Sequence, residues 1–152
     1  MTPSPASEAS TVDSSIGIIM NGVTGRMGYR QHLVRSILAI RDAGGLELAD
    51  GRRVVPEPIL VGRNERKLAE LAAQHGIERW TTDLDEALRD DSAPIYFDAQ
   101  VTQAREKSIK AAIAAGKHIY TEKPTAESLE GALELARLAA EAGGQERRRP
   151  RQ

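Results

Sequence analysis

The chain of 152 residues has no cysteine, few aromatic residues (3%) and almost no net charge (-1). The absence of cysteine excludes disulfides, thiolate nucleophiles and zinc held by sulfur, and it fits the reducing cytoplasm in which we expect the protein. So small a net charge gives no reason to expect nucleic acid or an anionic membrane as a partner. No stretch approaches the roughly 18 apolar residues of a membrane helix.

The sequence does contain an alternation of short apolar runs and helical stretches. We predict strands over residues 16–20, 58–62, 80–81, 95–97 and 118–121. Helices are predicted over 26–43 and 104–115, after the capping residues Asn64 and Asp83, and through Leu129 to Ala140. Because 152 residues can bury one ordinary core, this alternation predicts an α/β protein with a Rossmann-like, doubly wound parallel sheet.

Three segments are expected outside this core. Residues 1–14 are rich in Ser, Thr, Pro and Ala, which predicts a disordered tail. Residues 46–57 resemble a surface insertion, with Asp50-Gly51 as a hairpin or a plain turn. Residues 144–152 carry a run of arginines and are predicted to be a second disordered tail. The predicted dinucleotide-binding domain therefore spans residues 15–143.

A glycine-rich turn follows the first predicted strand and opens the first predicted helix. A pyrophosphate needs close backbone and free N–H groups, which glycines and a helix N-terminus supply together. The spacing is G-x-x-G-x-x-G, a partial match to the G-x-G-x-x-G dinucleotide fingerprint. We therefore expect the cofactor phosphates at seven consecutive residues: Gly22, Val23, Thr24, Gly25, Arg26, Met27 and Gly28.

The end of the second predicted strand indicates which nicotinamide cofactor is bound. An acidic side chain at this place binds the ribose 2'-OH of NAD, whereas an arginine accommodates the 2'-phosphate of NADP. The residues here are Arg63 and Asn64, so NADP is predicted, with NAD as the other possibility and Arg26 as a second cation. The three histidines, His32, His75 and His118, are too scattered to predict a metal site.

Several motifs in order along the chain resemble the Gfo/Idh/MocA family of oxidoreductases, which includes glucose-fructose oxidoreductase and inositol dehydrogenase. They are the glycine turn, Thr82-Asp83, Asp98, the run Ala115-Gly116-Lys117-His118, Glu122-Lys123-Pro124 and Ser128-Leu129. The match covers about residues 16–143, which correspond to the N-terminal nucleotide-binding domain of the family. The resemblance implies an NAD(P)-dependent enzyme that acts on the hydroxyl or ketone of a sugar, polyol or related small molecule.

The same resemblance assigns roles to individual residues. It makes Lys123 the catalytic residue, pointing at the nicotinamide and the reacting hydroxyl, and it implies a cis bond between Lys123 and Pro124. Further cofactor contacts are implied for Val101, Thr102 and Glu122. The chain departs from the family at Arg105, which stands where a histidine is common.

The family also has a C-terminal α/β substrate domain, for which 152 residues leave no room. We therefore expect a truncated, catalytically incomplete chain, and a shifted reading frame from Gly144 onward is one hypothesis for its origin. Two alternatives stay open. One is a non-catalytic nucleotide-binding or regulatory module. The other is an enzyme like dihydrodipicolinate reductase, because Gly25-Arg26-Met27-Gly28 resembles the glycine turn of that family. A homo-oligomer is possible in each case.

Overall fold

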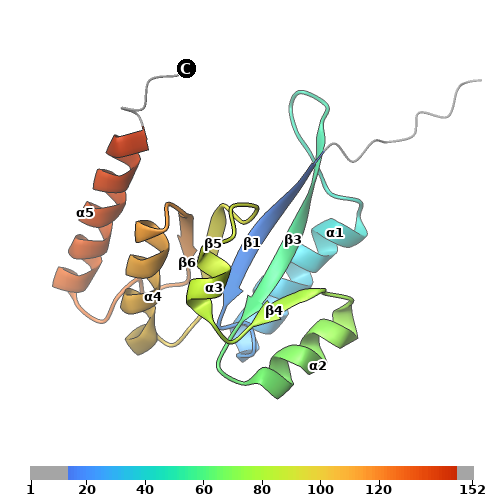
Figure 1. Cartoon of the computed structure of the whole chain (residues 1–152), viewed down its shortest axis with the longest axis horizontal. Helices are drawn as coiled ribbons and strands as arrows, with labels where there is room; N and C mark the ends of the chain where they lie inside the picture. Colours follow the sequence, from blue (N-terminus) through green and yellow to red (C-terminus); the bar gives the residue numbers. More distant parts are fainter. Residues whose placement is uncertain (1–13, 147–152) are drawn as a thin grey trace, which may run out of the picture.

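The computed structural model describes residues 14–146, in which six strands form one sheet with helices on both sides (Figure 1). The strands are β1 (Ser14–Asn21), β2 (Leu46–Glu47), β3 (Arg53–Val61), β4 (Arg79–Thr81), β5 (Ile95–Asp98) and β6 (His118–Thr121). The helices are η1 (Gly28–Leu38), α1 (Ala39–Asp42), α2 (Glu65–His75), α3 (Leu84–Leu88), α4 (Thr102–Ala114) and α5 (Leu129–Glu146).

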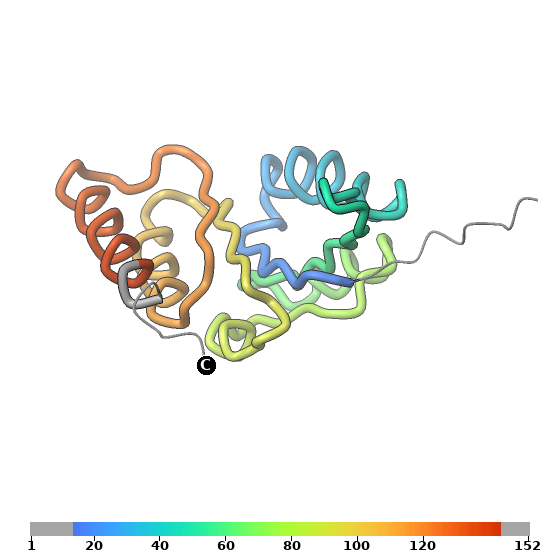
Figure 2. The backbone as a smooth tube through the Cα atoms, turned by 90° about the horizontal axis from the view of Figure 1, so that it is seen from above, coloured from blue at the N-terminus to red at the C-terminus, as the bar shows by residue number. Residues whose placement is uncertain are grey.

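The sheet has the strand order of a doubly wound fold. β1 lies between β3 and β5, β6 pairs with β5, β4 pairs with β3, and all of these pairs are parallel. The short β2 alone is antiparallel, beside the beginning of β3. Figure 2 shows η1 and α1 on one side of the sheet and α3 on the other. The predicted Rossmann-like α/β fold is confirmed.

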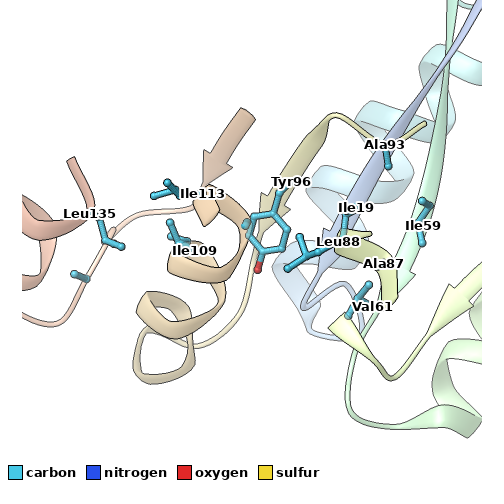
Figure 3. Packing of buried hydrophobic residues seen from close by; sticks show 12 residues of the cluster. Ile19, Ile59, Val61, Ala87, Leu88, Ala93, Tyr96, Ile109, Ile113 and Leu135 are labelled. Carbon is cyan, nitrogen blue, oxygen red and sulfur yellow. The ribbon is translucent and has the colours of Figure 1, made fainter. Parts of the chain in front are cut away.

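The core consists of two layers because successive strand residues face opposite sides of the sheet. Ile19 and Tyr96 pack on the side of α3, α4 and α5, where the Tyr96 ring lies between Ile109 and Leu88 in Figure 3. Their neighbours Met20 and Phe97 pack on the side of η1 and α2. Strands buried on both faces explain why the sequence shows continuous apolar runs instead of alternation.

The predicted surface insertion proves to be part of the sheet. β3 begins at Arg53, five residues before the predicted start of the second strand, and β2 pairs with its first residues. The reason is the length of β1: its eight residues align with the whole of Val54 to Val61, so the added residues of β3 find backbone partners. The turn at Asp50-Gly51 is the tip of the resulting hairpin, where Gly51 has a φ of +83°.

The first predicted helix is present, but most of it is wound as a π-helix instead of an α-helix. Residues 28–38 form a π-helix, η1, and the short α1 continues it. The buried residues of η1 are Gly28, Leu33 and Leu38. Met27, which precedes η1 and is one of the expected cofactor contacts, is 57% exposed.

The two predicted helix caps are confirmed: the Asn64 side chain accepts from the N–H of Lys67, and Asp83 accepts from that of Glu86. The predicted domain limits shift by a few residues. Ser14 is already part of β1, and α5 continues to Glu146, beyond the expected end at Gly143. Residues 1–13 and 147–152, and with them most of the two predicted tails, lie outside the described residues.

Candidate cofactor-binding edge of the sheet

The parallel strands end level with one another. Asn21, the last residue of β1, aligns with Val61 at the end of β3 and with Asp98 at the end of β5, which in turn aligns with Thr121 of β6. In Figure 1, β1 and β3 run side by side toward the same end of the sheet. The loops that follow these strands contain every predicted site residue, so the fold brings all of them to one edge. Ligands of open α/β sheets bind at this carboxyl edge.

The glycine turn joins β1 to η1 and has little freedom of sequence. Gly22 has a φ of +86°, and a Cβ there would lie 2.6 Å from the backbone of Ala99 and of Gln100. A Cβ on Gly28 would lie 2.6 Å from the Gly22 carbonyl oxygen. Both glycines are therefore required by close packing of the chain against itself. Gly22 and Gly28 also hold the turn against the loop that follows β5.

Gly25 is different, because the protein itself does not require a glycine there. It is exposed, and the nearest atom to an added Cβ is the Gly22 carbonyl oxygen at an ordinary 3.4 Å. The η1 N-terminus beside it has no side-chain cap at Met27 and no acidic residue in its first turn. Open space over a glycine beside an uncapped helix N-terminus is what a pyrophosphate requires, so the turn fits a dinucleotide.

A polar depression of about 750 Å³ lies between the glycine turn and the start of α2. It is lined by Thr24, Arg63, Asn64, Glu65, Arg66 and Lys67. Arg63 is exposed, and Arg66 forms an ion pair with Glu70 on α2 at 2.8 Å. With Arg66 paired to Glu70, Arg63 and Lys67 face the one carboxylate of Glu65, and the depression has a positive character that suits a phosphate group. Arg26, predicted as a second cation, is not part of its lining.

The loops after β5 and β6 carry the remaining predicted residues. Val101 precedes α4 as its N-cap and is 63% exposed, and Thr102 is the first residue of that helix. After β6, the Lys123-Pro124 peptide bond is cis, as predicted. Lys123 is exposed, and its side chain makes no hydrogen bond or ion pair within residues 14–146. The lysine is therefore presented to solvent at the edge.

A buried polar network connects these loops. Asn21 donates to the Tyr96 hydroxyl at 3.0 Å, and that hydroxyl donates to Asp98 at 2.6 Å. Asp98, which is fully buried, also forms an ion pair with Arg105 at 3.3 Å. Burial raises the pKa of Asp98, and the hydrogen bonds from Tyr96, from the Gln100 backbone and from Arg105 oppose that rise. Burial and the nearby Asp98 charge likewise raise the pKa of Tyr96.

A second contact joins η1 to the loop after β6. His32 interacts with the carboxylate of Glu122, and its ring lies 4.6 Å from that of Phe97. The hydrogen bond with His32, more than any other cause, lowers the pKa of Glu122. His32, one of the three scattered histidines, therefore has a structural contact. Glu122, predicted to contact the cofactor, thus holds its loop against η1.

Sequence reasoning missed the network of Asn21, Tyr96, Asp98 and Arg105. Arg105 was noted only as a departure from a family pattern, yet it is 3% exposed. One signal was available: Asp98 directly ends an apolar strand, and Arg105 lies on the apolar face of α4 with Ile109 and Ala112. A buried carboxylate and a buried guanidinium near each other in sequence indicate a pair.

Among residues 14–146, no group of three or more His, Asp and Glu residues is arranged to hold a metal ion. Within the same residues, no helix combines the length and the apolar character that crossing a bilayer requires. One buried polar atom in this part of the chain, Gln100 Oε1, has no hydrogen-bond partner, and it lies in the loop that packs against Gly22.

Comparisons with known proteins agree with this geometry. Residues 17–146 match the Gfo/Idh/MocA family, described as an oxidoreductase family with an NAD-binding Rossmann fold. A D-xylose dehydrogenase of Paenarthrobacter nicotinovorans is 58% identical over 133 residues, which are 88% of this chain and 34% of that protein. The chain thus spans about a third of the length of this curated relative.

Solved structures give the same picture. GenD2 from gentamicin A biosynthesis, in complex with NAD, is 30% identical with a TM-score of 0.65, over 94% of this chain and 35% of that one. Biliverdin reductase from Synechocystis, in complex with biliverdin and NADP+, is 25% identical with a TM-score of 0.62, and the match covers 85% of this chain and 35% of that one. These structures contain different nicotinamide cofactors.

Proposed function

Because the chain belongs to the Gfo/Idh/MocA oxidoreductase family, whose matching domain is an NAD-binding Rossmann fold, we propose that it binds NADP along the carboxyl edge of its sheet and serves a reaction on a sugar or polyol hydroxyl. This membership replaces the dihydrodipicolinate-reductase-like alternative. The observation that carries the cofactor assignment is the level ending of β1 and β3, which puts the glycine turn beside a cationic depression.

The phosphate end of the cofactor follows from these two features. The turn around Gly25 would hold the pyrophosphate with its backbone N–H groups, since Gly25 leaves room that the protein does not fill. Arg63, at the end of β3, would bind the 2'-phosphate, and Thr24 lines the same depression. The absence of an acidic residue directly after Val61 supports NADP over NAD.

The nicotinamide end would lie toward β6. A bound nicotinamide accepts or donates a hydride, and Lys123 is the exposed cation at that side of the edge. Its ammonium group would donate a hydrogen bond to the reacting oxygen and so align the hydroxyl. The relative named D-xylose dehydrogenase supports a sugar as the substrate.

Cofactor choice is tested by fluorescence titration of the chain with NADPH and with NADH. Arg63→Ala should weaken NADPH binding roughly tenfold or more, since one charge-assisted contact is worth about 1.5–3 kcal/mol. Binding of NADH should change less than about twofold, because its ribose has no 2'-phosphate. The matched control is Arg89→Ala, an exposed arginine at the end of α3, which should change neither affinity.

Three outcomes would count against the proposal. Tighter binding of NADH than of NADPH by the wild-type chain would refute the NADP assignment, and equal losses for both cofactors in Arg63→Ala would refute the role of Arg63. Failure to bind either cofactor would refute the site itself. Turnover is assayed separately with D-xylose or inositol and NADP+. Tight binding without turnover would fit both a truncated oxidoreductase and a non-catalytic nucleotide-binding module, and a partner pull-down would then separate these two.

A further inference from the structure

Arg105 is a buried arginine that the proposed cofactor site does not use. It lies in the first turn of α4 and is 3% exposed. Its Nε donates to Asp98 at 3.3 Å, and its Nη2 donates to the carbonyl oxygen of Gln100 at 2.6 Å. The remaining nitrogen, Nη1, donates to the carbonyl oxygens of Glu122, at 2.7 Å, and of Pro124. All three nitrogens of the guanidinium are therefore engaged.

The two carbonyl groups that Nη1 holds stand on either side of Lys123. The lysine itself has no side-chain partner in residues 14–146, so its direction depends on how its backbone is held. The backbone before Lys123 is held at the Glu122 carbonyl group and the backbone after it at the Pro124 carbonyl group, and Arg105 donates to both. A lysine at position 105 has a single nitrogen, so it could not hold Asp98 and the Gln100 carbonyl at the same time as the carbonyl groups of Glu122 and Pro124.

A series of buried hydrogen bonds also connects Arg105 to the strand residue that precedes the glycine turn. Asp98 orients its Nε, the Tyr96 hydroxyl orients Asp98, and Asn21 orients that hydroxyl. Asn21 is the residue immediately before Gly22, so an unbroken chain of hydrogen bonds runs from the glycine turn to the segment around Lys123. Every member of this chain is buried, where hydrogen bonds are strong and alternatives in water are excluded.

We propose that Arg105 is a positioning residue that sets Lys123 relative to the glycine turn, and so relative to a bound dinucleotide. The proposal rests on the proposed function, in which Lys123 acts at the nicotinamide end. Arg105 acts on Lys123 through the backbone of residues 122–124. Replacing it should disturb Lys123 most, because the carbonyl groups on both sides of that residue lose their donor.

The test compares the wild-type chain with Arg105→Lys in two measurements. Without cofactor, amide hydrogen exchange at Lys123 should become about tenfold faster in the variant, while the amide of Leu60 in the core changes less than about twofold. With NADPH, the NMR signal of ¹³C-methylated Lys123, assigned by its loss in Lys123→Arg, should shift in the wild type and not in Arg105→Lys. The NADPH affinity of the variant should stay within about threefold, because the phosphate site is untouched.

The matched control is Arg137→Lys on α5, whose arginine forms exposed ion pairs with Glu134 and Glu141. It should reproduce the wild-type exchange and shift. Wild-type behaviour of Lys123 in Arg105→Lys would overturn the proposal. Equal acceleration at Lys123 and Leu60 would also overturn it, since Arg105 would then serve global stability only.

If Arg105→Lys does not fold, the proposal is tested on the wild type by the rate of rotation about the Cζ–Nε bond of Arg105. Slow rotation on the NMR timescale would support the proposed hydrogen bonds of the guanidinium, and free rotation would overturn them. If NADPH causes no shift at Lys123 and does not bind the wild-type chain, the proposed function fails instead. The exchange measurement without cofactor would still decide whether Arg105 holds the segment.

Discussion

The substitution Tyr96→Phe removes one oxygen from the centre of the buried network and leaves the ring packing intact. That oxygen donates to the Asp98 carboxylate and accepts from Asn21. A hydrogen bond to a charged group contributes about 1.5–3 kcal/mol, and the buried Asn21 amide would also lose its acceptor. We expect the free energy of unfolding at pH 7 to fall by about 3 kcal/mol, or roughly 6–12 °C in Tm for a chain of this size.

The loss should depend on pH with a definite sign. The Tyr96 hydrogen bond is the largest of the contributions that lower the pKa of Asp98, whereas burial raises it. Removing the hydroxyl therefore raises the folded-state pKa of Asp98 further above its unfolded value. A carboxyl with a raised folded pKa binds its proton more tightly in the folded state, so stability is lost as pH rises above the unfolded value of about 3.9. The difference between wild type and Tyr96→Phe should widen as pH rises through the folded-state pKa of Asp98 in the wild type.

The assay is urea denaturation followed by far-UV circular dichroism at several pH values. The matched control is Tyr120→Phe, because Tyr120 is 65% exposed and stacks on Phe97 through its ring alone. Its stability should stay within about 0.5 kcal/mol of wild type at every pH. A Tyr96→Phe variant as stable as this control, or a loss that does not change with pH, would refute the reasoning about the network.

Two other substitutions test the edge of the sheet. Gly22→Ala should lower the free energy of unfolding by about 3 kcal/mol and weaken NADPH binding, because a Cβ would strike rigid backbone at a positive φ. Gly51→Ala, also at a positive φ but with no atom within 4 Å, should cost only about 1 kcal/mol, and equal losses in a denaturation assay would contradict this account. Glu122→Gln should cost at most about 1 kcal/mol at pH 7, since its contact with His32 is partly exposed. Because the pKa of Glu122 is lowered in the fold, this contribution is present above the unfolded value of about 4.3 and is lost as pH falls through the folded value. A difference from wild type that persists at pH 2 would show that the charge of Glu122 is not responsible.

Local chemistry made much of the fold predictable. Asn64 and Asp83 cap helices through bonds to N–H groups only three residues away. β6 was predicted with its observed bounds, His118–Thr121, because an apolar run bounded by a glycine turn suffices to identify it. Gly22 and Gly28 of the turn are predictable for a similar reason, because a positive φ or a close backbone approach restricts the residue type at those positions.

Errors arose where a residue depends on a distant partner. The hairpin, one of the two alternatives for residues 46–57, is present, but that its second arm continues into β3 as one strand from Arg53 depends on how far β1 extends beside it. The π-helical winding of η1 likewise departs from the ordinary helix that the residue pattern predicts. Both outcomes depend on the surface that the segment meets and not on its own residue pattern.

The βα alternation, the glycine turn and the positions of Arg63 and Lys123 at strand ends can be predicted from residues that are close together in the chain. The contact of Arg105 with the carbonyl groups of Glu122 and Pro124, and the contact of Asn21 with Tyr96 across 75 positions of sequence, exist only in the folded protein. A buried polar group needs a hydrogen-bond partner, and that partner can come from any part of the chain. That partner is set by the packing of strands and helices, which short sequence patterns do not contain.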